Sequence, residues 1–68
     1  MIMQSVSSSN LALVGYENKT LRIEFHSGGI YDYYNVLESV YLDLMNASSK
    51  GEYHAQFIKY NYEYAKIR

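Results

Sequence analysis

Residues 21–26 alternate strictly between apolar and polar side chains, and this run constrains the fold more than any other part of the chain. Leu21, Ile23 and Phe25 would point to one side of a strand, and the residues between them to the other side. An alternation with a period of two is typical of a β-strand that has one face on a core and one face in water. The chain is therefore expected to contain a sheet with one buried face.

A second strand candidate, residues 11–16, precedes this run and is separated from it by a turn-type cluster, residues 17–20. If these four residues form the loop, the apolar side chains of both strands meet on one face. The facing pairs are then Tyr16 with Leu21 and Val14 with Ile23. We therefore expect an antiparallel hairpin over residues 11–26.

A third strand candidate begins at Ile30, after the turn Ser27-Gly28-Gly29. A three-residue loop with glycine in the left-handed conformation puts Tyr31 opposite Phe25, with Tyr33 on the same core face. A two-residue loop would instead put Tyr31 opposite Glu24 on the open face, because a slip of one residue reverses every side chain. We favour the three-residue loop because two glycines suit a bulged turn.

Two helices are predicted after this strand, because two positions carry the spacing of a capping box. The pairs are Asn35 with Glu38 and Ser49 with Glu52. Apolar residues recur between these two starts at intervals of three and four, as on one face of a helix. They are Val36, Leu37, Val40, Tyr41, Leu44 and Met45. The second helix would begin with Lys50.

The two ends of the chain are less constrained. Residues 1–9 are polar and serine-rich, and they form either an N-terminal arm or the lead into a strand. Residues 60–67 alternate like a strand but also keep a helical spacing, so periodicity leaves both structures open. The expected fold class is α+β. It is a three-stranded antiparallel meander followed by two short helices on one face and a tyrosine-rich C-terminal tail, in a single domain of residues 1–68.

The chain has no cysteine, so neither a disulfide nor a thiolate metal site braces its 68 residues. A chain of this length buries only about 60% of its unfolded surface. Nine tyrosines and two phenylalanines supply large rings to the thin core, and a homodimer is the alternative way to enlarge it. The lack of cysteine fits a cytoplasmic protein. The longest aliphatic run, Leu11–Val14, is too short to cross a membrane.

The formal net charge of −1 argues against a strong non-specific nucleic-acid binder. The two histidines, His26 and His54, have no carboxylate or histidine partner at a metal-ligand spacing. The sequence also lacks a phosphate loop and a nucleophile with a base beside it. We therefore expect no metal, no cofactor and no enzymatic activity.

An ordered set of residues extends over most of the chain. It consists of Ser8-Ser9-Asn10, Gly15-Tyr16, Leu21-x-Ile23-x-Phe25, Tyr31-x-Tyr33, Val36, Val40-Tyr41, Leu44, Ala47, Ser49-x-Gly51-x-Tyr53, Ile58 and Tyr62-x-Tyr64. With this set the chain resembles the KTSC domain family, which is named after the C-terminus of some lysyl-tRNA synthetases and includes stand-alone bacterial and phage proteins. The resemblance implies a domain of unassigned function, for which the synthetase context suggests RNA binding.

The chain departs from the usual family pattern at positions that bear on RNA binding. Lys59 stands where arginine is usual, which keeps the charge but loses the planar guanidinium. His54-Ala55 replaces a more usual aromatic–asparagine pair. Basic residues are also fewer than is typical, which weakens the RNA interpretation for this chain.

Three groups of residues are candidate binding sites. Tyr31 and Tyr33 are interpreted as core rings, with a stacking platform for bases as the alternative. The C-terminal segment interleaves aromatic and basic side chains, as a surface for single strands does, or it packs its rings on the sheet or on a second subunit. Its candidate residues are Lys59, Tyr60, Tyr62, Tyr64 and Lys66.

The third group is Ser8-Ser9-Asn10, whose hydroxyls and amide could hold a phosphate or a carboxylate. The alternative is that Ser8, Ser9 and Asn10 satisfy their own backbone in a turn. Two functions remain. One is a binding module for RNA that uses tyrosine stacking and a weakly basic C-terminal end. The other is a small phage-type or prophage-type protein that binds a host protein or a nucleotide-like ligand through the same aromatic surface.

Overall fold

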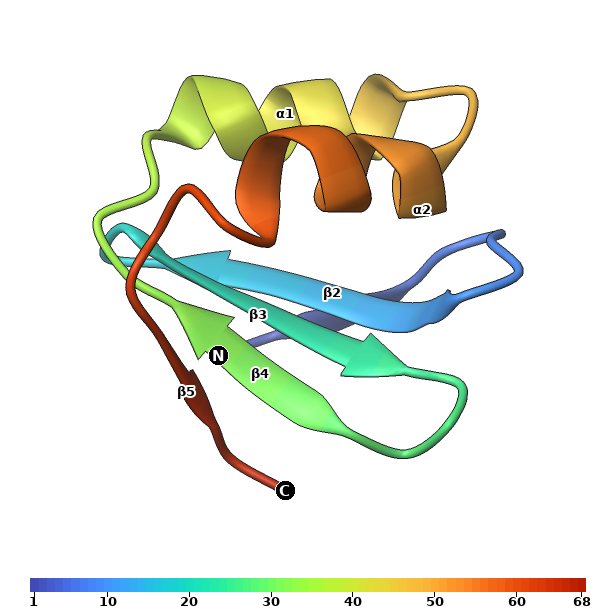
Figure 1. The fold of residues 1–68 in the computed structure, drawn as a ribbon, viewed down its shortest axis with the longest axis horizontal. Helices are drawn as coiled ribbons and strands as arrows, with labels where there is room; N and C mark the ends of the chain where they lie inside the picture. Colours follow the sequence, from blue (N-terminus) through green and yellow to red (C-terminus); the bar gives the residue numbers. More distant parts are fainter.

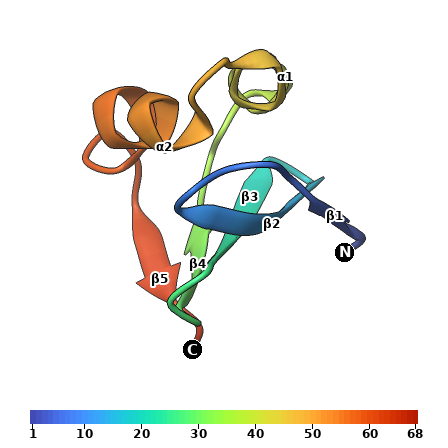
Figure 2. The same ribbon diagram turned by 90° about the vertical axis from the view of Figure 1, so that its right-hand side faces the viewer.

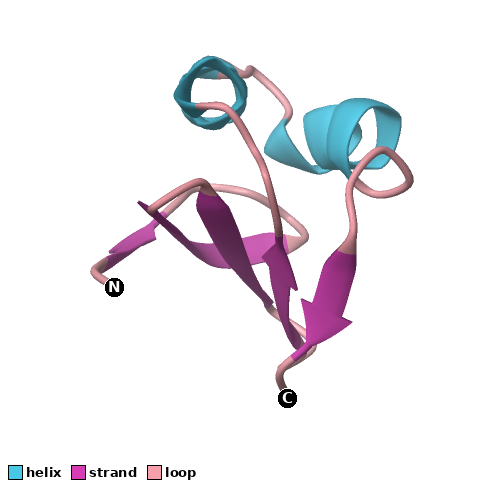
Figure 3. Ribbon diagram, turned by 90° about the vertical axis from the view of Figure 1, so that its left-hand side faces the viewer, coloured by secondary structure: helices cyan, strands magenta, loops and turns pink.

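In a computed structural model that describes residues 1–68, two short helical segments cover one face of a five-stranded antiparallel sheet (Figure 1). The strands lie in sequence order across the sheet. The elements are β1 (Met3–Ser5), β2 (Leu11–Glu17), β3 (Thr20–Phe25), β4 (Ile30–Tyr33), α1 (Glu38–Asn46), α2 (Lys50–Tyr53), the π-helical turn η1 (His54–Ile58) and β5 (Tyr64–Lys66). This two-layer arrangement, which Figure 3 shows from the side, confirms the predicted α+β class.

The sheet is wider than the predicted three-stranded meander, because one strand is added at each edge (Figure 2). β1 forms in the segment that was expected to be an arm or the lead into a strand, and it pairs with β2. In the segment 60–67, whose structure the sequence left open, only Tyr64–Lys66 form a strand, β5, in which Tyr64 pairs with Tyr33 and Lys66 with Tyr31. Residues 60 and 61 lie in a turn after η1. The helical alternative for this segment is therefore wrong.

The β2–β3 hairpin has the predicted facing pairs, Tyr16 with Leu21 and Val14 with Ile23. Its turn is shorter than the predicted four residues. Asn18 and Lys19 both adopt left-handed φ angles, 50° and 63°, which is the backbone of a two-residue type I′ turn. The strand register is nevertheless the predicted one, because Glu17 and Thr20, the first and last residues of the expected loop, pair with each other.

The β3–β4 hairpin has the expected three-residue loop, but the loop lies one residue earlier, at residues 26–28. The Phe25 N–H donates to the Gly29 carbonyl at 2.9 Å, and Gly28 takes a φ of 103° that suits glycine. Tyr31 therefore faces Ile23 and not Phe25 as predicted. Because the pairing shifts by two residues, Tyr31 still points to the helix side of the sheet, as expected.

The first helix starts later than the capping-box spacing predicts. Asn35 is no cap, because it adopts a left-handed φ of 59°. The Val36 N–H then donates to the Lys19 carbonyl at 2.9 Å, which draws the chain over the sheet before α1 begins. Leu37, expected on the apolar stripe, is exposed and precedes the helix without a side-chain cap. This tertiary hydrogen bond overrides the local cap signal.

The second helix starts as predicted, because the Ser49 hydroxyl accepts from the Glu52 N–H at 3.3 Å. The core between the helices and the sheet consists of eight buried side chains. They are Leu11, Val14, Leu21, Ile23, Tyr33, Val36, Leu44 and Ile58. None of the helices is long and apolar enough to cross a membrane.

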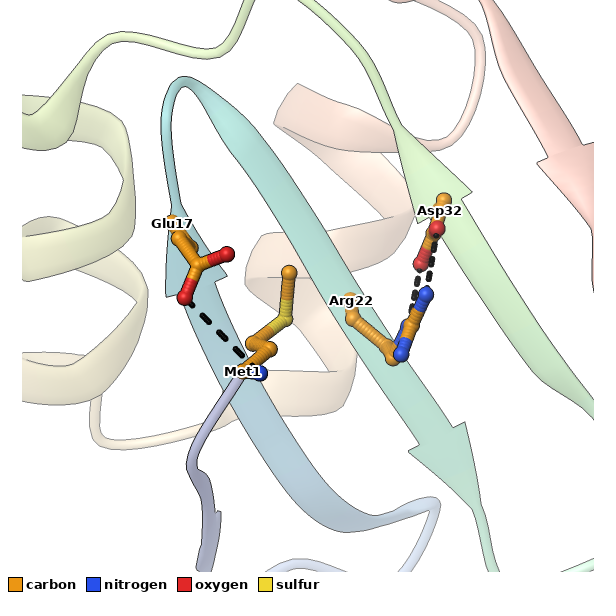
Figure 4. A network of polar contacts seen from close by, with 4 residues as sticks. All are labelled: Met1, Glu17, Arg22 and Asp32. Carbon is orange, nitrogen blue, oxygen red and sulfur yellow. Dashed lines mark hydrogen bonds and ion pairs between the residues drawn. The ribbon is translucent and has the colours of Figure 1, made fainter.

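The sheet face turned away from the helices carries a bidentate ion pair between Arg22 and Asp32 (Figure 4). The Nε–Oδ1 distance is 2.7 Å and the Nη2–Oδ2 distance is 2.9 Å. Two parallel charge-assisted bonds of this kind satisfy the buried Asp32 carboxylate. Arg22 thus points away from the core, as the alternation predicts.

Candidate functional site

A cleft of about 610 Å³ opens between η1 and the end of the sheet that carries β4 and β5. Its volume lies within the range of about 300–1,000 Å³ that is usual for ligand sites. Five aromatic residues line it, and we call it the aromatic cleft: Phe25, Tyr31, Tyr33, Tyr60 and Tyr64. Tyr60 and Tyr64 are exposed, Phe25 and Tyr31 are half-buried, and Tyr33 is buried.

Three tyrosines form a contiguous aromatic surface on the sheet, because cross-strand pairing brings them to one face. The Tyr31 and Tyr33 rings lie 6.4 Å apart at an interplanar angle of 22°. Tyr64, opposite Tyr33 on β5, lies 5.9 Å from the Tyr31 ring and 6.0 Å from the Tyr33 ring. Tyr33 is buried, whereas 57% of Tyr64 is exposed. The surface thus extends from the core to solvent.

His54, the first residue of η1, packs against this surface and joins the helical layer to the sheet. Its Nε2 lies 2.8 Å from the Tyr33 hydroxyl, and its ring packs edge-to-face on Phe25 at 5.1 Å. Burial lowers the pKa of His54, with a smaller contribution from Lys59. Burial also raises the pKa of Tyr33 to about 12. Both side chains are therefore neutral at pH 7.

The π-helical turn sets the positions of both His54 and Lys59. The Lys59 N–H donates to the His54 carbonyl, five residues earlier, at 2.9 Å. Such wide turns are rare and occur often at functional sites. The Lys59 ammonium lies 5.2 Å from the centre of the Tyr60 ring, a cation–π distance. A single positive charge is thus placed beside the rings.

The loop before β2 also lines the cleft, through Ser9 and Asn10. The Ser8 hydroxyl accepts from the backbone N–H groups of Asn10 and Leu11, at 3.2 and 3.1 Å. His26 connects this loop to the β3–β4 turn. Its backbone N–H donates to the Asn10 carbonyl at 2.9 Å, and its ring Nε2 lies 2.9 Å from the Ser8 carbonyl. Ser8 therefore serves its own turn, and the Asn10 side chain faces the cleft.

Most of the residues singled out from the sequence meet at this cleft, although they come from three separate segments. Those that line it are Ser9, Asn10, Tyr31, Tyr33, Lys59, Tyr60 and Tyr64. Tyr62 packs against the core. Lys66 does not line the cleft but pairs with Tyr31, so its side chain leaves the same face of the sheet. Ser8 and Ser9 also border a smaller polar hollow with Lys50.

Sequence reasoning missed several lining residues, above all His54, which was considered only as a metal ligand. The others are Phe25, His26, Ser27, Gly51 and Ala55. A helical spacing of three and four from Gly51 to His54 and Ala55 was the available signal, since it places these residues on the face that carries Ile58. Gly51 lets the Asn10 side chain pack closely there, since a Cβ at this position would lie 3.0 Å from Asn10 Nδ2.

The chemistry of the cleft suits binding. No aspartate or glutamate lines it, and Lys59 is its one fully charged group. Neither histidine meets a serine hydroxyl, because His26 contacts a backbone carbonyl and His54 the Tyr33 hydroxyl. The structure has no group of three or more histidine, cysteine, aspartate or glutamate side chains that could hold a metal ion. The cleft therefore offers aromatic faces, hydrogen-bonding groups and one cation.

Most of the chain matches a known family. A model of the KTSC domain matches residues 7–62 of the chain. The chain belongs to the KTSC domain family. The matched range includes every lining residue of the aromatic cleft except Tyr64.

Individual relatives of this KTSC domain agree with that assignment. A lysine–tRNA ligase of Nostoc punctiforme is 46% identical over 54 residues, which is 76% of this chain and 10% of the ligase. A second lysine–tRNA ligase, of Nostoc sp., is 45% identical over 49 residues, 72% of this chain and 9% of the ligase. The chain thus spans about a tenth of the length of these relatives.

A solved structure agrees over the whole fold. The crystal structure of a KTSC domain protein from Yersinia pestis is 36% identical and superposes with a TM-score of 0.95. The match covers 98% of this chain and 97% of the other. The five-stranded sheet with its two helical segments is therefore also the fold of that KTSC domain protein.

Proposed function

We propose that this KTSC domain is a non-catalytic module that binds single-stranded RNA by stacking an unpaired base in the aromatic cleft. One observation carries the proposal: the exposed rings of Tyr60 and Tyr64 and the half-buried ring of Tyr31 line a cleft that contains a lysine and no carboxylate. Every base has a π-face, and stacking on an aromatic side chain contributes about 1–3 kcal/mol per base. RNA is the favoured nucleic acid because two relatives are, by name, lysine–tRNA ligases.

The charges beside the cleft set how RNA would be held. Lys59 lines the cleft, and Lys66 leaves the cleft face of the sheet from the neighbouring edge strand. These two cations can meet the phosphates that flank a stacked base. With a net charge of −1 the domain has little further attraction for a polyanion, so aromatic stacking has to supply most of the affinity.

A titration of labelled single-stranded RNA at two salt concentrations tests the proposal. For single strands, each neutralised phosphate lowers affinity by about 2.6-fold between about 50 mM and about 200 mM salt. Two lysine contacts therefore predict a loss of about sevenfold. Lys59→Gln is expected to remove one contact and reduce that loss to about 2.6-fold, while Lys19→Gln, in the distant β2–β3 turn, should leave the salt dependence unchanged.

Absence of binding at the lower salt concentration would show that the proposal is wrong. An aromatic interface for a protein partner, the alternative function, predicts no RNA binding in either condition. If Lys59→Gln left both the affinity and its salt dependence unaltered, the RNA site would lie away from the cleft.

A further inference from the structure

His54 stands at the junction of the two parts of the aromatic cleft. On the sheet side, its Nε2 lies 2.8 Å from the hydroxyl of Tyr33, and the Tyr33 ring contacts the rings of Tyr31 and Tyr64. On the helix side, the His54 carbonyl accepts the Lys59 N–H that closes the π-helical turn. His54 thus connects the stacking rings to the lysine, the two groups that RNA binding needs in one place.

The bond between His54 and Tyr33 suits a neutral imidazole. Only 3% of Tyr33 is exposed, and His54 is the one side-chain hydrogen-bond partner of its hydroxyl. A neutral ring can accept the proton of the tyrosine O–H through Nε2, whereas both nitrogens of an imidazolium are donors. After protonation the hydroxyl would have to accept, and its own proton would then lack a side-chain partner. A buried donor without a partner is costly, so protonation of His54 weakens the bond.

The packing of His54 also opposes a positive charge on its ring. The ring packs edge-to-face on Phe25 at 5.1 Å and on Tyr33 at 5.6 Å. Only 8% of the residue is exposed. Burial of this kind disfavours the charged form of a histidine, so proton uptake favours a position of the ring that is nearer to water.

The titratable side chains around the ring include no acid. Those that line the cleft with His54 come from the β3–β4 turn, β4, the residues after η1, and β5: His26, Tyr31, Tyr33, Lys59, Tyr60 and Tyr64. The charged residues of α2, Lys50 and Glu52, do not line it. An imidazolium would therefore meet a second cation, Lys59, and no carboxylate in the cleft.

We propose that His54 is the positioning residue of the aromatic cleft and that only its neutral form holds the tyrosine rings and Lys59 together for RNA, so that uptake of one proton releases the RNA. This inference rests on the proposed function. Protonation weakens the bond to the Tyr33 hydroxyl and moves His54 toward water. Because Lys59 is bonded to the His54 carbonyl, the lysine moves away from the rings with it.

Two titrations of the domain test this coupling. NMR signals of the His54 ring, recorded without RNA, give its pKa, which burial lowers below the ordinary value of 6.5. Labelled oligouridine, whose base does not titrate between about pH 8 and about pH 5, gives the RNA affinity over the range in which histidine changes charge. The affinity is expected to follow the neutral fraction of His54, with about half of its full value at the measured pKa and about a tenth one pH unit lower. Circular dichroism at each pH restricts the comparison to folded protein.

Variants that cannot titrate assign the effect to His54. His26→Gln serves as the background, because it leaves His54 as the only histidine of the chain. In that background His54→Phe keeps a ring without a nitrogen that binds a proton, and His54→Gln keeps an amide acceptor for the Tyr33 hydroxyl. Both are expected to bind oligouridine with an affinity that no longer falls in mild acid, and His54→Gln should bind more tightly than His54→Phe. His54→Gln keeps the test valid if His54→Phe destabilises the fold.

Three results would overturn the inference and leave the proposed function standing. The first is an affinity that stays constant while His54 takes up its proton. The second is an affinity that rises as the pH falls, as a direct contact between the His54 cation and a phosphate would produce. The third is a fall in affinity that persists in both His54 variants. Absence of RNA binding at about pH 8, where His54 is neutral, would instead overturn the proposed function itself.

Discussion

The Leu44→Ala variant is expected to lose about 2–5 kcal/mol of unfolding free energy. Leu44 is fully buried and packs α1 against the sheet. Removing its side chain leaves a cavity in addition to the lost burial. A domain of 68 residues has a total stability of only about 3–10 kcal/mol. Much of the population should therefore unfold, which urea denaturation followed by circular dichroism measures directly.

Leu42→Ala is the matched control, because Leu42 lies on the same helix but is 48% exposed. The same chemical change there should shift the unfolding free energy by no more than about 0.5 kcal/mol. If the two variants unfolded at the same urea concentration, α1 would not pack on the sheet as described. Both variants replace a leucine of α1 by alanine, so the change in helix propensity is the same in each. The difference between them therefore measures how much the packing of α1 on the sheet contributes to stability.

The Tyr64→Ala variant is expected to weaken RNA binding by about tenfold, since stacking of a base on one ring contributes about 1–3 kcal/mol. Tyr64 is the most exposed of the three sheet tyrosines in the cleft and is in contact with both others. Because it lies on an edge strand and is more than half exposed, its loss should change stability little. Fluorescence anisotropy with labelled oligouridine measures the affinity.

Two controls separate stacking from other effects of this substitution. Tyr64→Phe keeps the ring and should retain most of the affinity. Tyr34→Ala removes a partly exposed tyrosine that does not line the cleft, and it should bind RNA like the unsubstituted domain. If Tyr34→Ala and Tyr64→Ala weakened binding equally, the cleft would not be the place where the base stacks.

The sequence was sufficient where local patterns and the fold agree. The alternation at residues 21–26 and the pairing of Val14 with Ile23 are confirmed, and so is the cap at Ser49. These features depend on side chains close together in the chain. The side of the sheet on which Tyr31 lies was also predicted, because a shift of two residues preserves the face.

Other features depend on contacts between distant segments, which single-sequence patterns do not contain. The cap predicted at Asn35 fails because Val36 bonds to Lys19, far away in the chain. His54 gained its place in the cleft only through a π-helical turn and the hydroxyl of Tyr33, which lies 21 positions earlier. The edge strand β5 likewise forms because β4 offers it an unpaired edge.

The most direct test of the aromatic cleft as an RNA site is an NMR titration of the domain with oligouridine at low salt. The largest amide shifts are expected at Asn10, Tyr31, His54 and Tyr64, which line the cleft from the loop before β2, from β4, from η1 and from β5. The opposite face of the sheet, around Arg22, should not respond (Figure 4). Shifts centred on that face, or no shifts at saturating RNA, would contradict the account.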